Sequence, residues 1–305
     1  MPSHAVNSFI FNGLWMFASF AILFATPLRA QDKPYFVTYS QDLEEPGNLE
    51  IETKSASAKP EGGGRYGATA VELEYGTRAW WTTELYLDGQ TTAQDSTLFT
   101  GFRIENRVRP LMRDHAVNPL LYVEYENISG ADKTILEVVG HDGQADLAGP
   151  NGDLSREHQH EAELKLILSS NVKGWNISEN FIAEKNLGHD PWEFGYAMGV
   201  TRPLRSAASS RPCTFCAEQF IAGAEVYGGL GNTLALTMRD TSHYIAPLAG
   251  WQLPKGVRLS FSPGFGLTGS SLTRIYRVGV AYEFDQIGSW LHGPSGRTDA
   301  QGGVL

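Results

Sequence analysis

The chain has 305 residues, of which 42% are hydrophobic and 11% aromatic, and its formal net charge is −10 at pH 7. An acidic balance of this size argues against a nucleic-acid partner, because binding to phosphates needs a basic surface. The length suits one large β domain or two ordinary ones, and since no low-complexity linker interrupts the middle of the chain, we expect one domain.

The first thirty residues predict an export signal. Residues 14–25 read LWMFASFAILFA, an apolar run too short to span a bilayer as a helix, and Pro27 and the residues LRA follow it. This pattern is typical of a secretory signal, so we assign residues 1–30 to a signal peptide that is cleaved after Ala30. A transmembrane anchor is the alternative. No later stretch approaches the roughly 18 apolar residues of a spanning helix, so the rest of the chain is expected to be exported.

From residue 47 onward, short segments alternate between apolar and polar residues, as strands with one apolar face do. With the residues that flank these apolar positions, each segment is expected to be near the ~9–11 residues that a tilted membrane strand needs. In chain order, we expect twelve strands near residues 49–53, 69–75, 81–87, 98–104, 121–125, 162–168, 175–181, 192–200, 220–226, 245–251, 257–267 and 276–284. Segments 134–139 and 234–238 would add two more, so fourteen strands is the alternative.

The character of the two faces favours a membrane barrel over a soluble β-sandwich, although alternation alone fits both. The apolar face carries aromatic residues near strand ends, including Trp81, Trp175 and Trp251, as interfacial girdles require. The other face is charged, and we assign to the lumen Arg103, Glu105, Arg107, Glu124, Glu126, Glu161, Glu163, Arg258, Arg277 and Glu283.

These features predict an all-β fold, an antiparallel up-and-down transmembrane β-barrel. The barrel is expected to span residues 47–284. Residues 31–46 are expected to form a periplasmic N-terminal segment, and residues 285–305 a flexible C-terminal tail.

Several segments resemble small bacterial outer-membrane barrels. HYIAPLAGWQLPKG, SPGFGLTGSS and YRVGVAYEF resemble the last three strands of such barrels, and VELEYGTRAWWTTELYLDG resembles a tight hairpin near their start. The nearest grouping is the outer-membrane proteins labelled after the MetA pathway of phenol degradation. The resemblance implies an outer-membrane location, with membrane lipid and the barrel-assembly machinery as partners. It also implies that Tyr282 and Phe284 act as assembly-signal aromatics, although in such barrels the final strand usually ends the chain and here residues 285–305 follow.

Two cysteines occur in RPCTFCAEQ. In an exported protein, Cys213 and Cys216 predict a local disulfide that closes a tight loop. A haem-attachment motif would need histidine at position 217, where this chain has Ala217.

His158 and His160 are weak candidates for a metal site. Their spacing places both on one face of a strand near the outer rim, but no third ligand is identifiable nearby, so we expect a solvated pair. The chain has no G-x-S-x-G elbow, and Ser242 and His243 would point to opposite faces of a strand. We therefore expect no enzyme, no metal and no cofactor.

The expected function is a passive or gated conduit for small solutes in the outer membrane, with an acidic lumen that favours cations. We expect Arg103, Arg107 and Arg277 to pair with Glu105, Glu124 and Glu283, and a complete network would close the pore. One alternative is a non-conducting barrel with an adhesive, assembly or envelope-structural role. Another is a soluble periplasmic β-protein that binds an apolar ligand.

Overall fold

The computed structural model describes residues 34–136, 138–140, 143–188, 190–205, 213–253 and 256–287. The expected signal peptide, residues 1–30, and residues 288–305 of the expected tail lie outside the described residues. Within the described ranges, no helix is long and apolar enough to cross a membrane.

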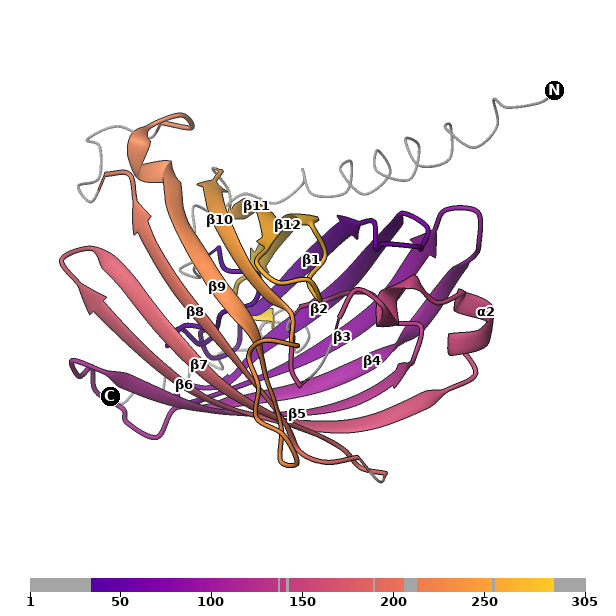
Figure 1. Cartoon of the computed structure of the whole chain (residues 1–305). Coiled ribbons are helices and arrows are strands. Elements are labelled where there is room, and N and C mark those ends of the chain that lie inside the picture. The colour runs from indigo at the N-terminus through magenta and orange to yellow at the C-terminus, as the bar shows by residue number, and fades with distance from the viewer. Residues whose placement is uncertain are drawn as a thin grey trace, which may run out of the picture.

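Antiparallel strands close into one barrel, in which each strand pairs with its neighbours along the chain and β1 pairs with β12 (Figure 1). The strands are β1 Leu49–Ala58, β2 Tyr66–Arg78, β3 Trp81–Thr92, β4 Thr97–Val108, β5 Asn118–Ser129, β6 His158–Val172, β7 Trp175–Asn186, β8 Glu193–Pro203, β9 Phe220–Asn232, β10 His243–Gln252, β11 Val257–Gly266 and β12 Arg274–Phe284. Short helical turns are η1 Asp146–Ala148, α2 Asn151–Leu154 and η2 Ala217–Gln219.

The prediction of twelve strands is confirmed, and the fourteen-strand alternative is wrong. In the described parts of 134–139 and 234–238 no strand forms, and the local pairing there is an isolated bridge between Gly231 and Leu236. Both segments belong to connections between barrel strands.

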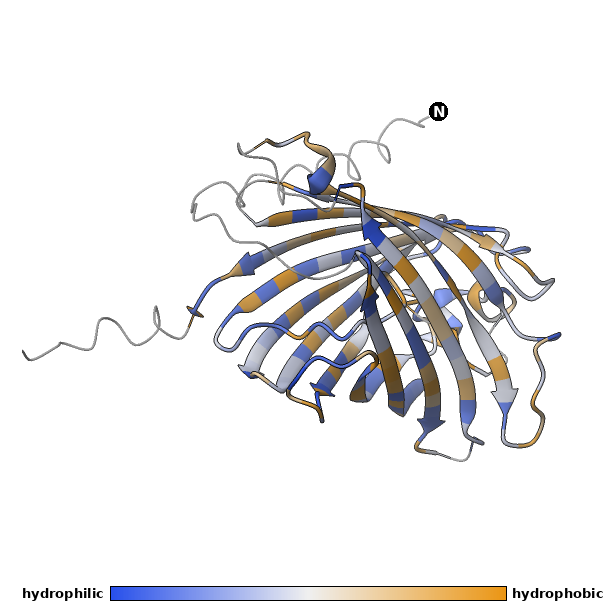
Figure 2. Ribbon diagram, turned by 90° about the vertical axis from the view of Figure 1, so that its left-hand side faces the viewer, coloured by the Kyte–Doolittle hydropathy of each residue, from blue (hydrophilic) through white to orange (hydrophobic). Residues whose placement is uncertain are grey.

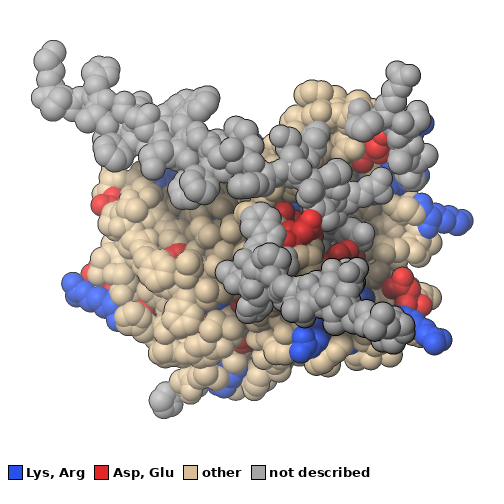
Figure 3. Space-filling view, turned by 180° about the vertical axis from the view of Figure 1, so that it is seen from behind, with Lys and Arg blue, Asp and Glu red and all other residues tan. Residues whose placement is uncertain are grey.

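Strand alternation sets an apolar outer face and a polar inner face, visible as alternating bands in Figure 2. On β12, Val278 and Val280 are 47% and 45% exposed, whereas Arg277, which lies between Tyr276 and Val278, is 1% exposed. On β11, Phe261 is exposed and Ser262 is buried. In Figure 3, uncharged residues cover most of the visible wall and the lysines and arginines lie at its edges. Because a soluble protein would bury the apolar face, this arrangement is that of a membrane barrel.

The two ends of the barrel differ in their connections. At the terminus end, where β1 begins and β12 ends, Lys173 and Gly174 join β6 to β7 with φ angles of 51° and 82°. Two central residues with positive φ form the kind of tight turn that suits a hairpin. At the opposite end, called the loop end, residues 130–157 connect β5 to β6.

Candidate functional site in the barrel lumen

Glutamates form a continuous line across the inner face of the barrel, which we call the glutamate ladder. Strand register places Glu283 opposite Glu50 and Glu50 opposite Glu74, and the pairing continues strand by strand to β8. The ladder consists of Glu283, Glu50, Glu74, Glu84, Glu105, Glu124, Glu163, Glu184 and Glu193.

The glutamate ladder climbs from one end of the barrel to the other. Barrel strands are tilted and staggered, so a line drawn across them advances along the barrel axis. The ladder starts at the terminus end with Glu283, near the end of β12, and reaches the loop end with Glu193, the first residue of β8. Each member of the ladder lies on the strand next to that of the preceding member, and neighbouring strands lie about 4.8 Å apart.

Buried basic side chains neutralise much of this ladder. Arg107 contacts three of its members at once: Glu74 at 2.5 Å, Glu105 at 3.0 Å, and Glu84. Other ion pairs on the inner face include Arg258–Glu50 (2.7 Å), Arg258–Glu52 (3.1 Å), Lys54–Glu52 (3.7 Å), Lys54–Glu72 (2.8 Å), Arg103–Asp88 (2.9 Å), Arg103–Glu124 (3.6 Å) and Lys165–Glu163 (2.8 Å). Such pairing is needed because a buried carboxylate without a partner costs several kcal/mol.

The expected pairing of Arg277 with Glu283 does not occur. Arg277 donates hydrogen bonds to the Tyr227 hydroxyl at 2.5 Å and to the Ile135 carbonyl at 3.1 Å, whereas Glu283 accepts one from Asn48 Nδ2 at 2.6 Å. Arg277 and Glu283 are six positions apart on one strand, which separates them by about 20 Å. Opposite charge favoured the pair, but distance along the strand excludes it.

The N-terminal segment, residues 34–48, lies inside the barrel instead of outside it as expected. Glu225, on the inner face of β9, accepts hydrogen bonds from the amides of Phe36, Val37 and Thr38 at 3.2, 2.9 and 2.7 Å. All three residues are buried, at most 5% exposed. Because the amides of three consecutive residues share this one carboxyl group, Glu225 anchors the segment.

Two tyrosines connect the N-terminal segment to the wall on either side of it. The Tyr35 hydroxyl donates to Asn176 Oδ1 at 2.9 Å, and burial raises the pKa of Tyr35, which keeps the hydroxyl protonated. The Tyr39 amide donates to Asn180 Oδ1 at 2.6 Å, and the Tyr39 hydroxyl donates to Glu105 at 2.9 Å. The segment therefore spans the lumen from β7 to the glutamate ladder.

Glycines on the inner face make room for the N-terminal segment. A Cβ atom at Gly199 on β8 would overlap the Tyr35 ring, and one at Gly250 on β10 would lie 2.8 Å from Pro34. The inner wall is thus shaped to the chain that occupies it.

A second segment, the β5–β6 loop, enters the lumen from the loop end. Its Lys133 is 2% exposed and donates from Nζ to Asn151 Oδ1 at 3.0 Å. Its Val138 shares one apolar cluster with Phe36 and Val37. The two inserted segments therefore contribute to the same apolar cluster inside the barrel.

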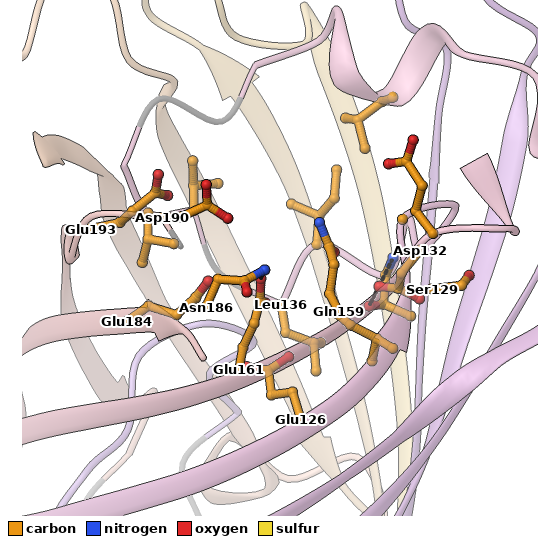
Figure 4. Close-up of a pocket in the computed structure, with 18 of the residues that line it drawn as sticks. Glu126, Ser129, Asp132, Leu136, Gln159, Glu161, Glu184, Asn186, Asp190 and Glu193 are labelled. Carbon is orange, nitrogen blue, oxygen red and sulfur yellow. Dashed lines mark hydrogen bonds between the residues drawn. The ribbon is translucent and has the colours of Figure 1, made fainter. Parts of the chain in front are cut away.

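A cavity of about 440 Å³, which we call the vestibule, lies at the loop end next to this loop. Acidic residues dominate its polar lining: Glu126, Glu157, Glu161, Glu184, Asp190, Glu193 and Asp132, together with the basic Arg103 (Figure 4). The vestibule is the larger open part of the interior, since a second cavity beside the N-terminal segment measures about 50 Å³.

The charged residues predicted for the lumen lie on its inner face. Those residues are 8% exposed or less, except for the half-buried Glu161, and comprise Arg103, Glu105, Arg107, Glu124, Glu126, Glu161, Glu163, Arg258, Arg277 and Glu283. The sequence argument did not single out Glu225 or place residues 34–46 in the lumen. One available signal was the glycines on neighbouring strands, which leave space that the wall does not fill.

The remaining candidates lie outside the lumen. His158 and His160 are exposed, and His160 Nδ1 is 2.8 Å from the Tyr125 hydroxyl on the outer face. Within the described chain, neither histidine belongs to a group of three side chains close enough to share a metal ion. Tyr282 and Phe284 make an edge contact with ring centroids 4.6 Å apart. Cys213 and Cys216 form a disulfide in the β8–β9 connection.

A closed barrel of twelve antiparallel strands with an apolar exterior and a charged interior defines a transmembrane β-barrel. Neither a protein-family model nor a curated protein matches this sequence.

Solved structures similar to this chain include three outer-membrane barrels. The COG4313 outer membrane channel from Pseudomonas putida F1 shares 11% identity, with 84% of this chain and 100% of that chain covered and a TM-score of 0.49. The KdgM porin shares 8% identity, with 77% and 99% covered and a TM-score of 0.47. The NanC porin shares 10% identity, with 77% and 98% covered and a TM-score of 0.46. The similarity concerns the barrel fold and extends no further.

Proposed function

We propose that this protein is an outer-membrane channel for small solutes, that its lumen favours cations, and that the two inserted segments keep it closed. The observation that carries the proposal is the glutamate ladder, which supplies a continuous line of carboxylates from one end of the barrel to the other.

The charge balance of the inner face supports cation preference. Its basic strand residues are Lys54, Arg103, Arg107, Lys165, Arg258 and Arg277, and several of them are shared by two or three carboxylates. Acidic side chains therefore remain in excess. In a narrow tube with low-dielectric walls, such an excess attracts cations and repels anions.

The N-terminal segment is suited to opening because the wall does not depend on it. β1 and β12 pair along their whole length, from Leu49 with Phe284 to Ala58 with Ile275. The barrel is therefore closed by residues that follow the segment. Residues 34–46 are held by side chains of the wall, among them Glu225, Asn180 and Arg109, whereas Gly47 and Asn48 form backbone hydrogen bonds with Gly76 of β2. Displacement of residues 34–46 breaks no hydrogen bond between strands.

Conductance in a planar bilayer tests this proposal. We expect the wild-type chain to show rare or small openings in KCl, and the double variant Glu225→Ala with Asn180→Ala to open more often, because it removes the hydrogen bonds that hold residues 36–39 to β9 and β7. The exposed outer-face residue Glu179 supplies a matched control, Glu179→Gln, which should behave as the wild type. Each variant is first checked for folding by the different gel mobility of its unheated and heated forms.

A non-conducting barrel with a structural role is the second candidate. It is favoured by the filled lumen, where Phe36, Val37 and Val138 share one apolar cluster. A folded double variant that passes no current would support this second reading over the channel.

A further inference from the structure

Three carboxylates gather in the vestibule by strand register. Glu126 on β5 is directly opposite Glu161 on β6, and Glu184 on β7 is two positions along from Asn186, the partner of Glu161. One oxygen from each glutamate can be chosen so that all three lie within 4.8 Å of one another. Figure 4 shows the three side chains, from three neighbouring strands, lining the same space.

Glu126 gives a second, independent indication of a ligand. It is 6% exposed and lines the vestibule, yet it makes no hydrogen bond and no ion pair with any described residue. Its nearest arginine along the sheet, Arg103, already contacts Asp88 and Glu124. Glu126 is opposite Arg103 in strand register and feels its charge, but no basic group of the described residues lies within ion-pair distance of Glu126.

A second acidic group with the same spacing shows how the chain neutralises such a cluster elsewhere. Glu72, Glu74 and Glu84 also lie within 4.8 Å of one another, but Lys54 contacts the first at 2.8 Å and Arg107 contacts the other two. Among the described residues, no lysine or arginine forms an ion pair with Glu126 or Glu161, because Arg103, the cross-strand partner of Glu126, contacts Asp88 and Glu124.

We propose that Glu126, Glu161 and Glu184 bind a divalent cation, and that Ca²⁺ is preferred. Ca²⁺ takes carboxylate oxygens at about 2.3–2.6 Å, so two of its ligands can be up to about 5 Å apart. Mg²⁺ keeps several of its waters and is usually held by one or two carboxylates. Three carboxylate oxygens within 4.8 Å of one another therefore favour Ca²⁺, and a group made only of carboxylates suits a hard cation over zinc.

Bound Ca²⁺ would place positive charge at the loop end of the glutamate ladder, of which Glu184 is a member. The site would thus supply, at this end, the counter-charge that Arg107 supplies further down. The binding does not depend on conduction, so a barrel that passes no current can still carry the site.

Calorimetric titration of the full chain in detergent with CaCl₂ tests the site. We expect one ion per chain with an affinity of ~0.1–1 mM, as in extracellular calcium modules, and weaker binding of MgCl₂. Loss of a residue that only supports a metal ligand typically costs about tenfold or more in metal affinity. Glu126→Gln and Glu184→Gln each remove a direct ligand, so each should weaken Ca²⁺ binding by more than about tenfold. Glu157→Gln, which changes an exposed acid of the same vestibule, should leave it unchanged.

Three results would overturn the proposal. The first is no Ca²⁺ binding by the folded wild type at 10 mM, which is ~tenfold above the upper expected value. The others are an equal loss of Ca²⁺ affinity in all three variants, or no loss of affinity in the two triad variants. Equal loss would mean that the vestibule attracts cations only through its general charge. The two triad substitutions are on different strands, so if one variant fails to fold, as judged by heat-dependent gel mobility, the other still tests the site.

Discussion

The inner wall of this barrel has two contrasting parts. From β1 to β6 it carries long charged side chains, such as Arg107, Glu105 and Lys165, which reach one another in ion pairs. From β8 to β11 it carries many small residues beside larger ones such as Glu225 and Arg258, and the N-terminal segment packs against the small residues Gly199 and Gly250.

The contrast shows two ways of filling a barrel of this width. An eight-stranded barrel can be filled by its own side chains and a sixteen-stranded one leaves a water channel, so twelve strands lie between these cases. Here the charged part of the wall fills the lumen next to it with paired side chains. The small-residue part leaves space in the lumen that the N-terminal segment occupies. The first arrangement is part of the wall, whereas the second consists of chain outside the strands, which we propose can be withdrawn.

The largest effect is expected in the charged part, from Arg107→Met. This change leaves Glu74, Glu84 and Glu105 without their shared counter-charge and should reduce the free energy of unfolding by about 3–5 kcal/mol. Urea unfolding in lipid vesicles measures it. The exposed loop residue Arg239, changed to Met, is the control and should cost little. Equal stability of the two variants would mean that Arg107 does not neutralise the ladder.

The outer face should not distinguish the two parts, because both meet lipid. Val278→Arg on β12 and Leu166→Arg on β6 place a charge on exposed apolar positions, 47% and 42% exposed in the native chain. Each should cost about 2–4 kcal/mol near the bilayer midplane. The same unfolding measurement applies, with Val278→Leu as the control. A harmless arginine at either position would contradict the assignment of that strand's outer face.

In the small-residue part, Gly199→Val should displace the N-terminal segment. The new side chain overlaps the Tyr35 ring, and overpacking of this kind costs about 1–3 kcal/mol. We expect faster chymotrypsin cleavage at Tyr35 and Phe36 while the barrel stays folded. Gly67→Val is the control, since nothing lies within 4 Å of a Cβ atom there. Unchanged cleavage of the Gly199 variant would argue against a lumenal position of the segment.

The smallest effect is expected from replacing Cys213 and Cys216 together by serine. The disulfide closes a loop with a sequence separation of 3, so its entropic contribution should be well below the ~3 kcal/mol of a 15-residue loop. Heat-dependent gel mobility should be unchanged. Loss of the folded form would show that this connection orders the barrel more than its size suggests.

The charged part was predictable from sequence, because alternation with a period of two fixes which residues share a face. That rule placed Arg107 and Glu105 inside and Val278 outside. It did not reveal the glutamate ladder, since opposition between strands depends on register, which the turns and loops determine.

The occupant of the small-residue part was not predictable in the same way. Residues 34–46 have no long alternating run, and their contacts reach Glu225 and Asn180, far along the chain. Local patterns do not encode such pairings. Glycines at Gly199 and Gly250 indicate missing volume, but only the fold shows what fills it.

The permeability ratio of K⁺ to Cl⁻ tests the central claim most directly. It is obtained from the reversal potential across a bilayer under a KCl gradient, with the Glu225→Ala, Asn180→Ala variant, which lacks the hydrogen bonds that hold residues 36–39 to β9 and β7. The glutamate ladder predicts a ratio above one, which falls toward one in concentrated salt as screening shortens the reach of the carboxylates. A ratio below one, in a variant that is folded and conducts, would contradict the account.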